Sequence, residues 1–150
     1  MTIPRPALAL GLGGLLPFLW GVLTLIVPGL HSLTLDTLGP RFVGPYVLIA
    51  YGSVILSFMS GVLWGFAARA DVEHRWSGYV LSVLPALWVF FMVGGGASRA
   101  LSALLVGYLA LLRLDMQFSH WGLTPRWWMR LRLMLTAGVV LALALGLWLG

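Results

Sequence analysis

The sequence lacks cysteine and lysine and contains few charged residues of any kind. Without cysteine the chain can form no disulfide, no thiol nucleophile and no thiolate ligand set for an iron–sulfur cluster. Only 9% of the residues are charged, whereas a soluble domain carries about a quarter, and 61% are hydrophobic. This composition excludes a water-facing globular surface and predicts that most of the chain lies in lipid.

Charge is also missing from the interior of the long apolar runs. Ion-coupled transporters and proton relays normally carry a carboxylate, histidine or arginine at mid-membrane depth. The polar groups in the middle of these runs are hydroxyls, which usually bond to their own backbone or at a packing face. The three histidines, His31, His74 and His120, lie outside the runs, so a haem held between facing helices is not expected.

Paired carboxylates, an activated nucleophile and an acid–base dyad are missing as well. We therefore expect no catalytic, cofactor-binding or metal-binding residues, and no enzyme activity.

Five long apolar runs predict an all-α, polytopic membrane protein with one transmembrane domain over residues 1–150. The expected membrane-spanning helices cover about residues 7–27, 45–68, 77–93, 98–114 and 127–148. The third and fourth are short for spanning, and a re-entrant pair is the alternative. Pro17 and Pro85 predict kinks.

Three segments between the runs are interpreted as non-helical. We expect a polar-leaning loop over residues 28–44, a charged loop over 69–76 and a segment at headgroup depth over 116–123.

The arginines predict the orientation. Seven lie in segments on the side of the N-terminus and two, Arg41 and Arg99, lie on the other side. Arginine in short loops is retained in the cytoplasm, so we expect the N-terminus inside and the C-terminus outside. The net charge of +5 favours anionic lipid headgroups as partners rather than nucleic acid.

The stretch Tyr46–Ala68 is predicted to be the centre of the bundle. Small residues recur there at every fourth position and form one ridge on a helix, along which a second helix can approach closely. They are Ser53, Ser57, Gly61 and Gly65. The ridge is interpreted as a helix-packing seam, either within the chain or against another protein.

The densest polar cluster follows the fourth run. Its members are Arg113, Asp115, Arg126, Arg130 and Arg132. One interpretation is a contact site for an anionic lipid headgroup or an acidic loop of a partner. The other is anchoring of the helices at the cytoplasmic interface together with one compensating ion pair.

Four sequence blocks resemble those of a domain-of-unknown-function family of small inner-membrane proteins, which includes bacterial proteins and mitochondrial transmembrane protein 69. The blocks are YGSVILSFMSGVLWGFA, YVLSVLPALWVF, LLRLDMQF and TPRWWMRLRLMLT. The resemblance covers about residues 12–136 and implies a multi-helix protein of the bacterial inner membrane, or of the mitochondrial inner membrane in a eukaryote. It implies no catalytic residues.

Two functions remain open. The first is an accessory, assembly or scaffolding subunit of a larger membrane complex, such as a respiratory complex, in contact with other integral membrane proteins. The alternative is a transporter or channel for an uncharged or lipidic small molecule, for which the prolines and glycines would break helices around a site. A membrane enzyme acting on quinone or lipid lacks every residue type that it would need.

Overall fold

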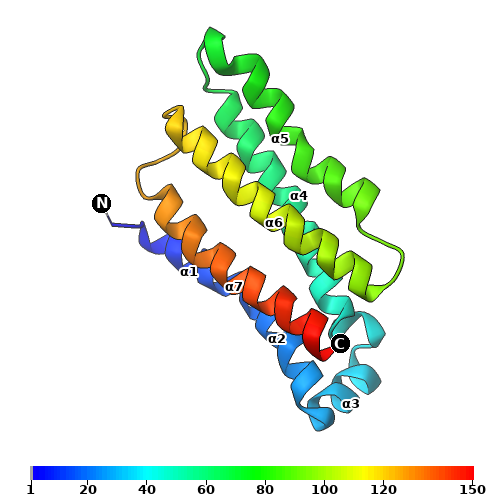
Figure 1. The fold of residues 1–150 in the computed structure, drawn as a ribbon. Helices are drawn as coiled ribbons and strands as arrows, with labels where there is room; N and C mark the ends of the chain where they lie inside the picture. The colour runs from blue at the N-terminus through cyan, green and yellow to red at the C-terminus, as the bar shows by residue number, and fades with distance from the viewer. Residues whose placement is uncertain (1) are drawn as a thin grey trace.

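The computed structural model describes residues 2–150, which form helices and connecting turns without a β-strand. The elements in chain order are α1 (Arg5–Gly13), α2 (Leu16–Ile26), α3 (Pro28–Thr37), η1 (Pro40–Phe42), α4 (Tyr46–Ala67), α5 (Val72–Met92), α6 (Ala97–His120) and α7 (Trp128–Leu149). The long helices run side by side, and the two termini lie at opposite ends of the bundle (Figure 1).

Within residues 2–150, five helical segments are long and apolar enough to span a membrane, which confirms the predicted fold class. They are α1 with α2, then α4, α5, α6 and α7. The structure corrects the third and fourth, which have 21 and 24 residues and so exceed the predicted lengths. At 1.5 Å per residue these helices reach roughly 30 Å or more, enough for the hydrocarbon core.

The charged segments flanking these two helices were wrongly predicted to be non-helical. Asp71 accepts a hydrogen bond from the backbone N–H of His74 at 3.1 Å and caps the start of α5, so residues 72–76 belong to the helix. At the C-terminal end of α6, residues 115–120 continue the helix because Phe118 is buried against the core. Packing overrides the mixed polarity there.

The first span is interrupted between α1 and α2. Pro17 has no N–H, so the carbonyl of Gly13, four residues earlier, loses its helical donor, and the proline ring crowds the same carbonyl. The backbone switches to shorter-range hydrogen bonds at this point, with the Leu15 N–H bonded to the Leu12 carbonyl at 3.0 Å. Pro17 was predicted to kink this span, and the structure shows an interruption of the helix that begins one turn before the proline.

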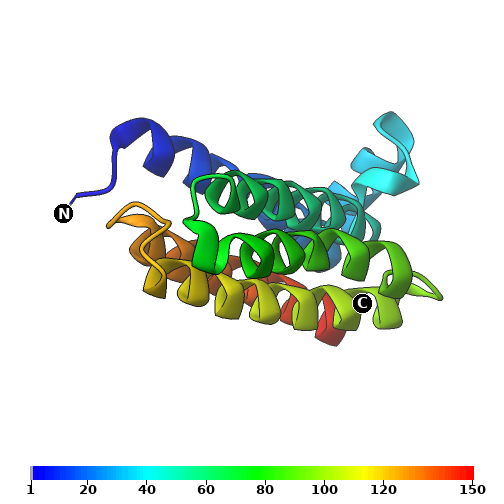
Figure 2. The same cartoon turned by 90° about the horizontal axis from the view of Figure 1, so that it is seen from above.

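Residues 28–44 are not the predicted loop. They contain α3 and η1, and α3 projects from the end of the bundle (Figure 2). The segment is tied back to α2 because the Thr24 hydroxyl accepts from the Gly44 N–H at 2.8 Å and the Trp20 indole donates to the Phe42 carbonyl at 3.0 Å.

Helix α4 is the centre of the bundle, since it packs against α2, α5, α6 and α7. Its buried side carries Leu48, Leu56 and Leu63, which are fully buried in the hydrophobic core. On the same side, the Tyr108 hydroxyl of α6 donates to the Gly52 carbonyl at 2.6 Å. The predicted central position of this stretch is therefore confirmed, through a different face from the one expected.

Candidate functional site

Asp115 of α6 and Arg132 of α7 form a buried ion pair. Arg132 Nε donates to Asp115 Oδ2 at 2.8 Å, and Trp128 Nε1 donates to Asp115 Oδ1 at 3.0 Å. Asp115 is 0% exposed and Arg132 is 5% exposed. Both carboxylate oxygens are thus engaged inside the protein, where no headgroup or partner loop reaches them.

This pair divides the predicted anionic contact site in two. Asp115 was wrongly assigned to lipid or partner contact, because it is buried and both its oxygens are engaged within the chain. Arg132 is also buried and bonds to Asp115 through Nε, so it does not lie at the interface with the exposed arginines. Arg113, Arg126 and Arg130 are exposed, and for them the contact with anionic headgroups stays a prediction. The ion pair that the alternative interpretation required is present.

The pair also lies within the spans. Asp115 lies five residues before the end of α6, and Arg132 lies four residues after the start of α7, so each is roughly 6–8 Å inside its helix. The expectation that Asp115 lies outside the fourth span was wrong, because that span was ended too early. A buried pair of this kind is costly to break, at about 3–5 kcal/mol when one partner is removed.

A cavity of about 310 Å³ adjoins the ion pair between α1, α2, α4, α6 and α7. Its polar lining consists of Tyr51, Tyr108, Arg132 and Thr136. Gly14 at the end of α1 lies on its wall, so the interruption of the first span faces this space. Thr136 is one of the mid-span hydroxyls for which the sequence leaves a lining role open beside a bond to the backbone, whereas the two tyrosines were not predicted as lining residues. Arg132 and Thr136 lie four residues apart on one helix face, a spacing that could have joined them in one site.

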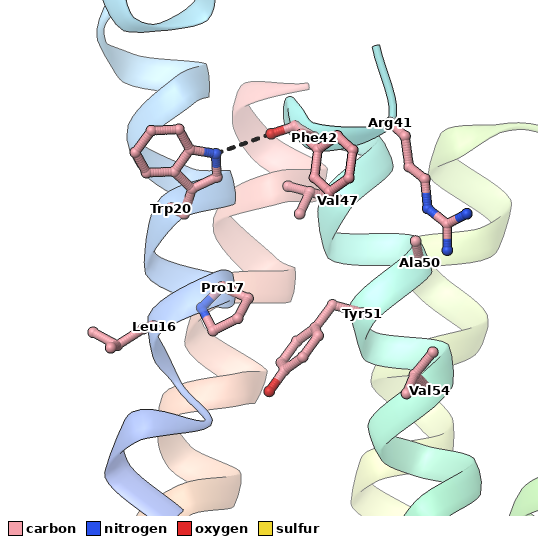
Figure 3. Close-up of a pocket in the computed structure, with 9 residues that line it drawn as sticks. All are labelled: Leu16, Pro17, Trp20, Arg41, Phe42, Val47, Ala50, Tyr51 and Val54. Carbon is pink, nitrogen blue, oxygen red and sulfur yellow. Dashed lines mark hydrogen bonds between the residues drawn. The ribbon is translucent and has the colours of Figure 1, made fainter. Parts of the chain in front are cut away.

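A second cavity, of about 480 Å³, lies between α2, η1 and α4 (Figure 3). Arg41 and Phe42 lie at its upper end, and the Tyr51 hydroxyl points from α4 toward the interruption between α1 and α2 (Figure 3). Tyr51 lines both cavities, so this one side chain stands between them.

Residues 3–148 match the family described as "Protein of unknown function (DUF3429)". The chain belongs to this family. Transmembrane protein 69 of Xenopus tropicalis is 32% identical over 144 residues, which cover 93% of this chain and 53% of the relative. The chain therefore spans about half the length of that relative. No solved structure matches the chain.

The resemblance drawn from the four sequence blocks is thus confirmed, and this DUF3429 protein is a multi-pass membrane protein by its five long apolar helices.

The outer face of α4 in this DUF3429 protein differs from the predicted seam. Gly61 and Gly65 are exposed, and a Cβ added at either would meet no atom of the described chain within 4 Å. Ser53 and Ser57 are half-buried, and Ser53 donates to the Ile49 carbonyl of its own helix at 2.7 Å. Packing within the chain was the wrong interpretation for Gly61 and Gly65. Contact with another protein stays a prediction there.

The histidines occupy helices rather than the predicted loops. His31 lies in α3, His120 ends α6, and the His74 ring of α5 stacks on Trp121 with centroids 4.7 Å apart. Potential ligand atoms of Asp71, Glu73 and His74 lie within 4.8 Å of one another at the exposed start of α5. Asp71 already serves there as the helix cap, which explains this proximity without a metal ion.

Proposed function

We propose that this protein is an accessory subunit of a larger membrane complex, such as a respiratory complex, without catalysis of its own. The outer face of α4, formed by Ser57, Gly61 and Gly65, supports this proposal. Glycine in a helix interior costs roughly 0.5–1 kcal/mol relative to alanine. Gly61 and Gly65 gain no close contact inside the described chain in return.

A transmembrane helix of another protein is the partner that fits this face. Without bulk at these positions, a second backbone can approach α4 closely and gain dispersion contacts that lipid tails do not supply. The face lies opposite the leucines of the core, so a partner there leaves the fold of this chain unchanged.

Gly61→Leu tests the proposal. We expect the variant to leave the native complex, as measured by native electrophoresis and quantitative mass spectrometry after gentle extraction. Its thermal stability as a free chain should stay within about 0.5 kcal/mol of wild type, as for an exposed substitution.

The matched control is Val106→Leu on the exposed side of α6, which should keep both the complex and the stability. Recovery of wild-type protein only as a free chain would contradict the accessory role. Unchanged association of Gly61→Leu would contradict the assigned face.

A transporter for an uncharged or lipidic small molecule is the second candidate. The interrupted first span favours it, because discontinuous helices commonly line the substrate sites of secondary transporters. Movement of such a molecule across proteoliposomes containing the purified chain would support this function, whereas an accessory subunit moves nothing.

We further propose an inner-membrane location with the N-terminus inside and with Arg113, Arg126 and Arg130 near anionic headgroups. The proposal rests on the excess of arginine at one end of the bundle. Reporter fusions at the C-terminus should be active only outside the cytoplasm. A fusion active in the cytoplasm would contradict it.

A further inference from the structure

Two buried polar atoms of α7 have no hydrogen-bond partner anywhere in residues 2–150. They are Arg132 Nη2 and Thr136 Oγ1. The two residues lie four positions apart, on one face of the helix, and both line the 310 Å³ cavity. Buried polar atoms normally have partners, so two neighbouring exceptions facing one space indicate a missing group.

Asp115 cannot be that group. Its Oδ2 already accepts from Arg132 Nε, and its Oδ1 accepts from the Trp128 indole. The carboxylate therefore holds one edge of the guanidinium group in place and compensates its charge, while Nη2 remains to donate to a third party. The Tyr108 hydroxyl is also engaged, with the Gly52 carbonyl.

Apart from Tyr51, the rest of the lining is apolar. Phe18, Ile55, Met59 and Val139 form much of the wall. Such a space, with few polar groups at one position, is typical of a small-molecule site, although its volume is near the small end of the usual range of about 300–1,000 Å³.

Part of the lining of this cavity lies on the lipid-facing side of the helices. Two of its lining residues are largely exposed, Leu10 of α1 at 79% and Phe58 of α4 at 64%. Both belong to membrane-spanning segments, so this part of the lining faces the acyl chains of a bilayer. A ligand that enters here comes from the lipid phase.

We propose that this cavity binds a membrane-soluble amphiphile whose oxygen-bearing head accepts hydrogen bonds from Arg132 Nη2 and the Thr136 hydroxyl. Its apolar body packs against the apolar wall of the cavity and extends toward the lipid between Leu10 and Phe58. A fatty-acid carboxylate, a phospholipid phosphate and a quinone carbonyl share this head chemistry. The proposal goes beyond the accessory role and does not depend on it, because the cavity and the outer face of α4 are separate surfaces.

Photocrosslinking in nanodiscs tests the proposal and separates the three sources. The probes are a diazirine fatty acid, a diazirine phospholipid and an azidoquinone, each with and without an excess of its unlabelled parent. We expect one probe to label cavity residues of α1, α4 or α7 in a manner that the parent abolishes, with the labelled peptides identified by mass spectrometry.

Two variants locate the head and the body of the ligand. Thr136→Val keeps the shape of the side chain and removes the hydroxyl, and it should weaken the competed labelling about tenfold. Ile55→Trp fills the apolar part and should abolish the labelling. Val106→Trp, an equally bulky change at an exposed site of α6, should leave the labelling at the wild-type level.

Folding is checked separately by melting in detergent. Thr136→Val should melt at or above the wild-type temperature without ligand, because it removes an unsatisfied polar atom, and should lose the stabilisation that the competing parent gives to wild type. Labelling spread evenly over lipid-facing helices, or unaffected by Thr136→Val and Ile55→Trp, would overturn the proposal. The proposal would also be overturned if none of the three probes gave competed labelling, because water would then be the group that bonds to Arg132 Nη2 and Thr136 Oγ1. Variants that lose this labelling should still be recovered in the native complex, and this result would distinguish the cavity from the outer face of α4.

Discussion

Two membrane-spanning segments of this protein contain an internal proline, and only one of them is interrupted. The first span separates into α1 and α2 before Pro17, whereas α5 continues through Pro85. Beside Pro85 the Ser60 hydroxyl of α4 donates to the Ser82 carbonyl and accepts from the Ala86 N–H at 3.3 Å. A regular helix would pair those two backbone groups with each other.

The comparison shows that the neighbouring helix decides what a proline does to a span. At Pro85 a buried serine of the neighbouring helix adds hydrogen bonds to two backbone groups next to the proline, as polar side chains do elsewhere in membrane helices. Near Pro17 the side chain from α4 is that of Tyr51, whose hydroxyl would lie 3.8 Å from a Cβ atom added to Gly14. This hydroxyl makes no bridge of this kind. The gap there becomes part of a cavity wall instead.

The largest expected effect lies beside the interrupted span. Asp115→Ala leaves the buried Arg132 without its counter-charge and should lower the free energy of unfolding by about 3–5 kcal/mol, measured by unfolding in mixed micelles. The double variant Asp115→Leu with Arg132→Leu removes both charges and should be much closer to wild type. If the single variant is as stable as wild type, the pair is not buried in the native protein.

Ser60→Ala tests the continuous span. It removes one hydroxyl and leaves two backbone groups of α5 without that partner, so we expect a loss of about 2 kcal/mol in the same assay. Ser53→Ala is the matched control, since that hydroxyl bonds only to its own helix, and its effect should stay within about 0.5 kcal/mol. Equal effects of the two variants would show that the bridge contributes nothing.

Pro17→Ala is expected to have a smaller effect than Ser60→Ala, and of the opposite sign. The new N–H can bond to the Gly13 carbonyl, which should stabilise the protein by about 1 kcal/mol and slow amide hydrogen exchange around residues 13–17. Pro85→Ala should change stability less, because Ser60 already satisfies the neighbouring groups. Undiminished exchange in Pro17→Ala would mean that the glycines, rather than the proline, keep the span open.

The class of the fold was predictable from the sequence because hydrophobic length and sparse charge are properties of single segments. The face by which α4 packs was not. Gly52 and Ser60 lie on its buried side, and Gly61 and Gly65 lie on the opposite side, so small residues occur on both. In a membrane helix both sides are apolar, and polarity does not distinguish the core from the lipid.

The candidate site was predictable only in part for a related reason. Arg132 and Asp115 were both recognised as polar residues of interest, but they are 17 positions apart and meet only through the packing of α6 on α7. The pairing of Ser60 with the gap at Pro85 likewise joins two helices over 26 positions. Local patterns carry no information about which helices become neighbours.

The Ser60 bridge has a mechanical consequence. Its hydroxyl engages groups on both sides of one gap in α5, so a slide of α4 along α5 by even one residue, about 1.5 Å, would break both bonds at once. The bridge therefore opposes sliding of α4 along α5 and favours one register between the two helices. Within residues 2–150 no side chain of a neighbouring helix bridges the backbone beside Pro17 in this way, so the interrupted first span is not held to α4 by such a pair of bonds.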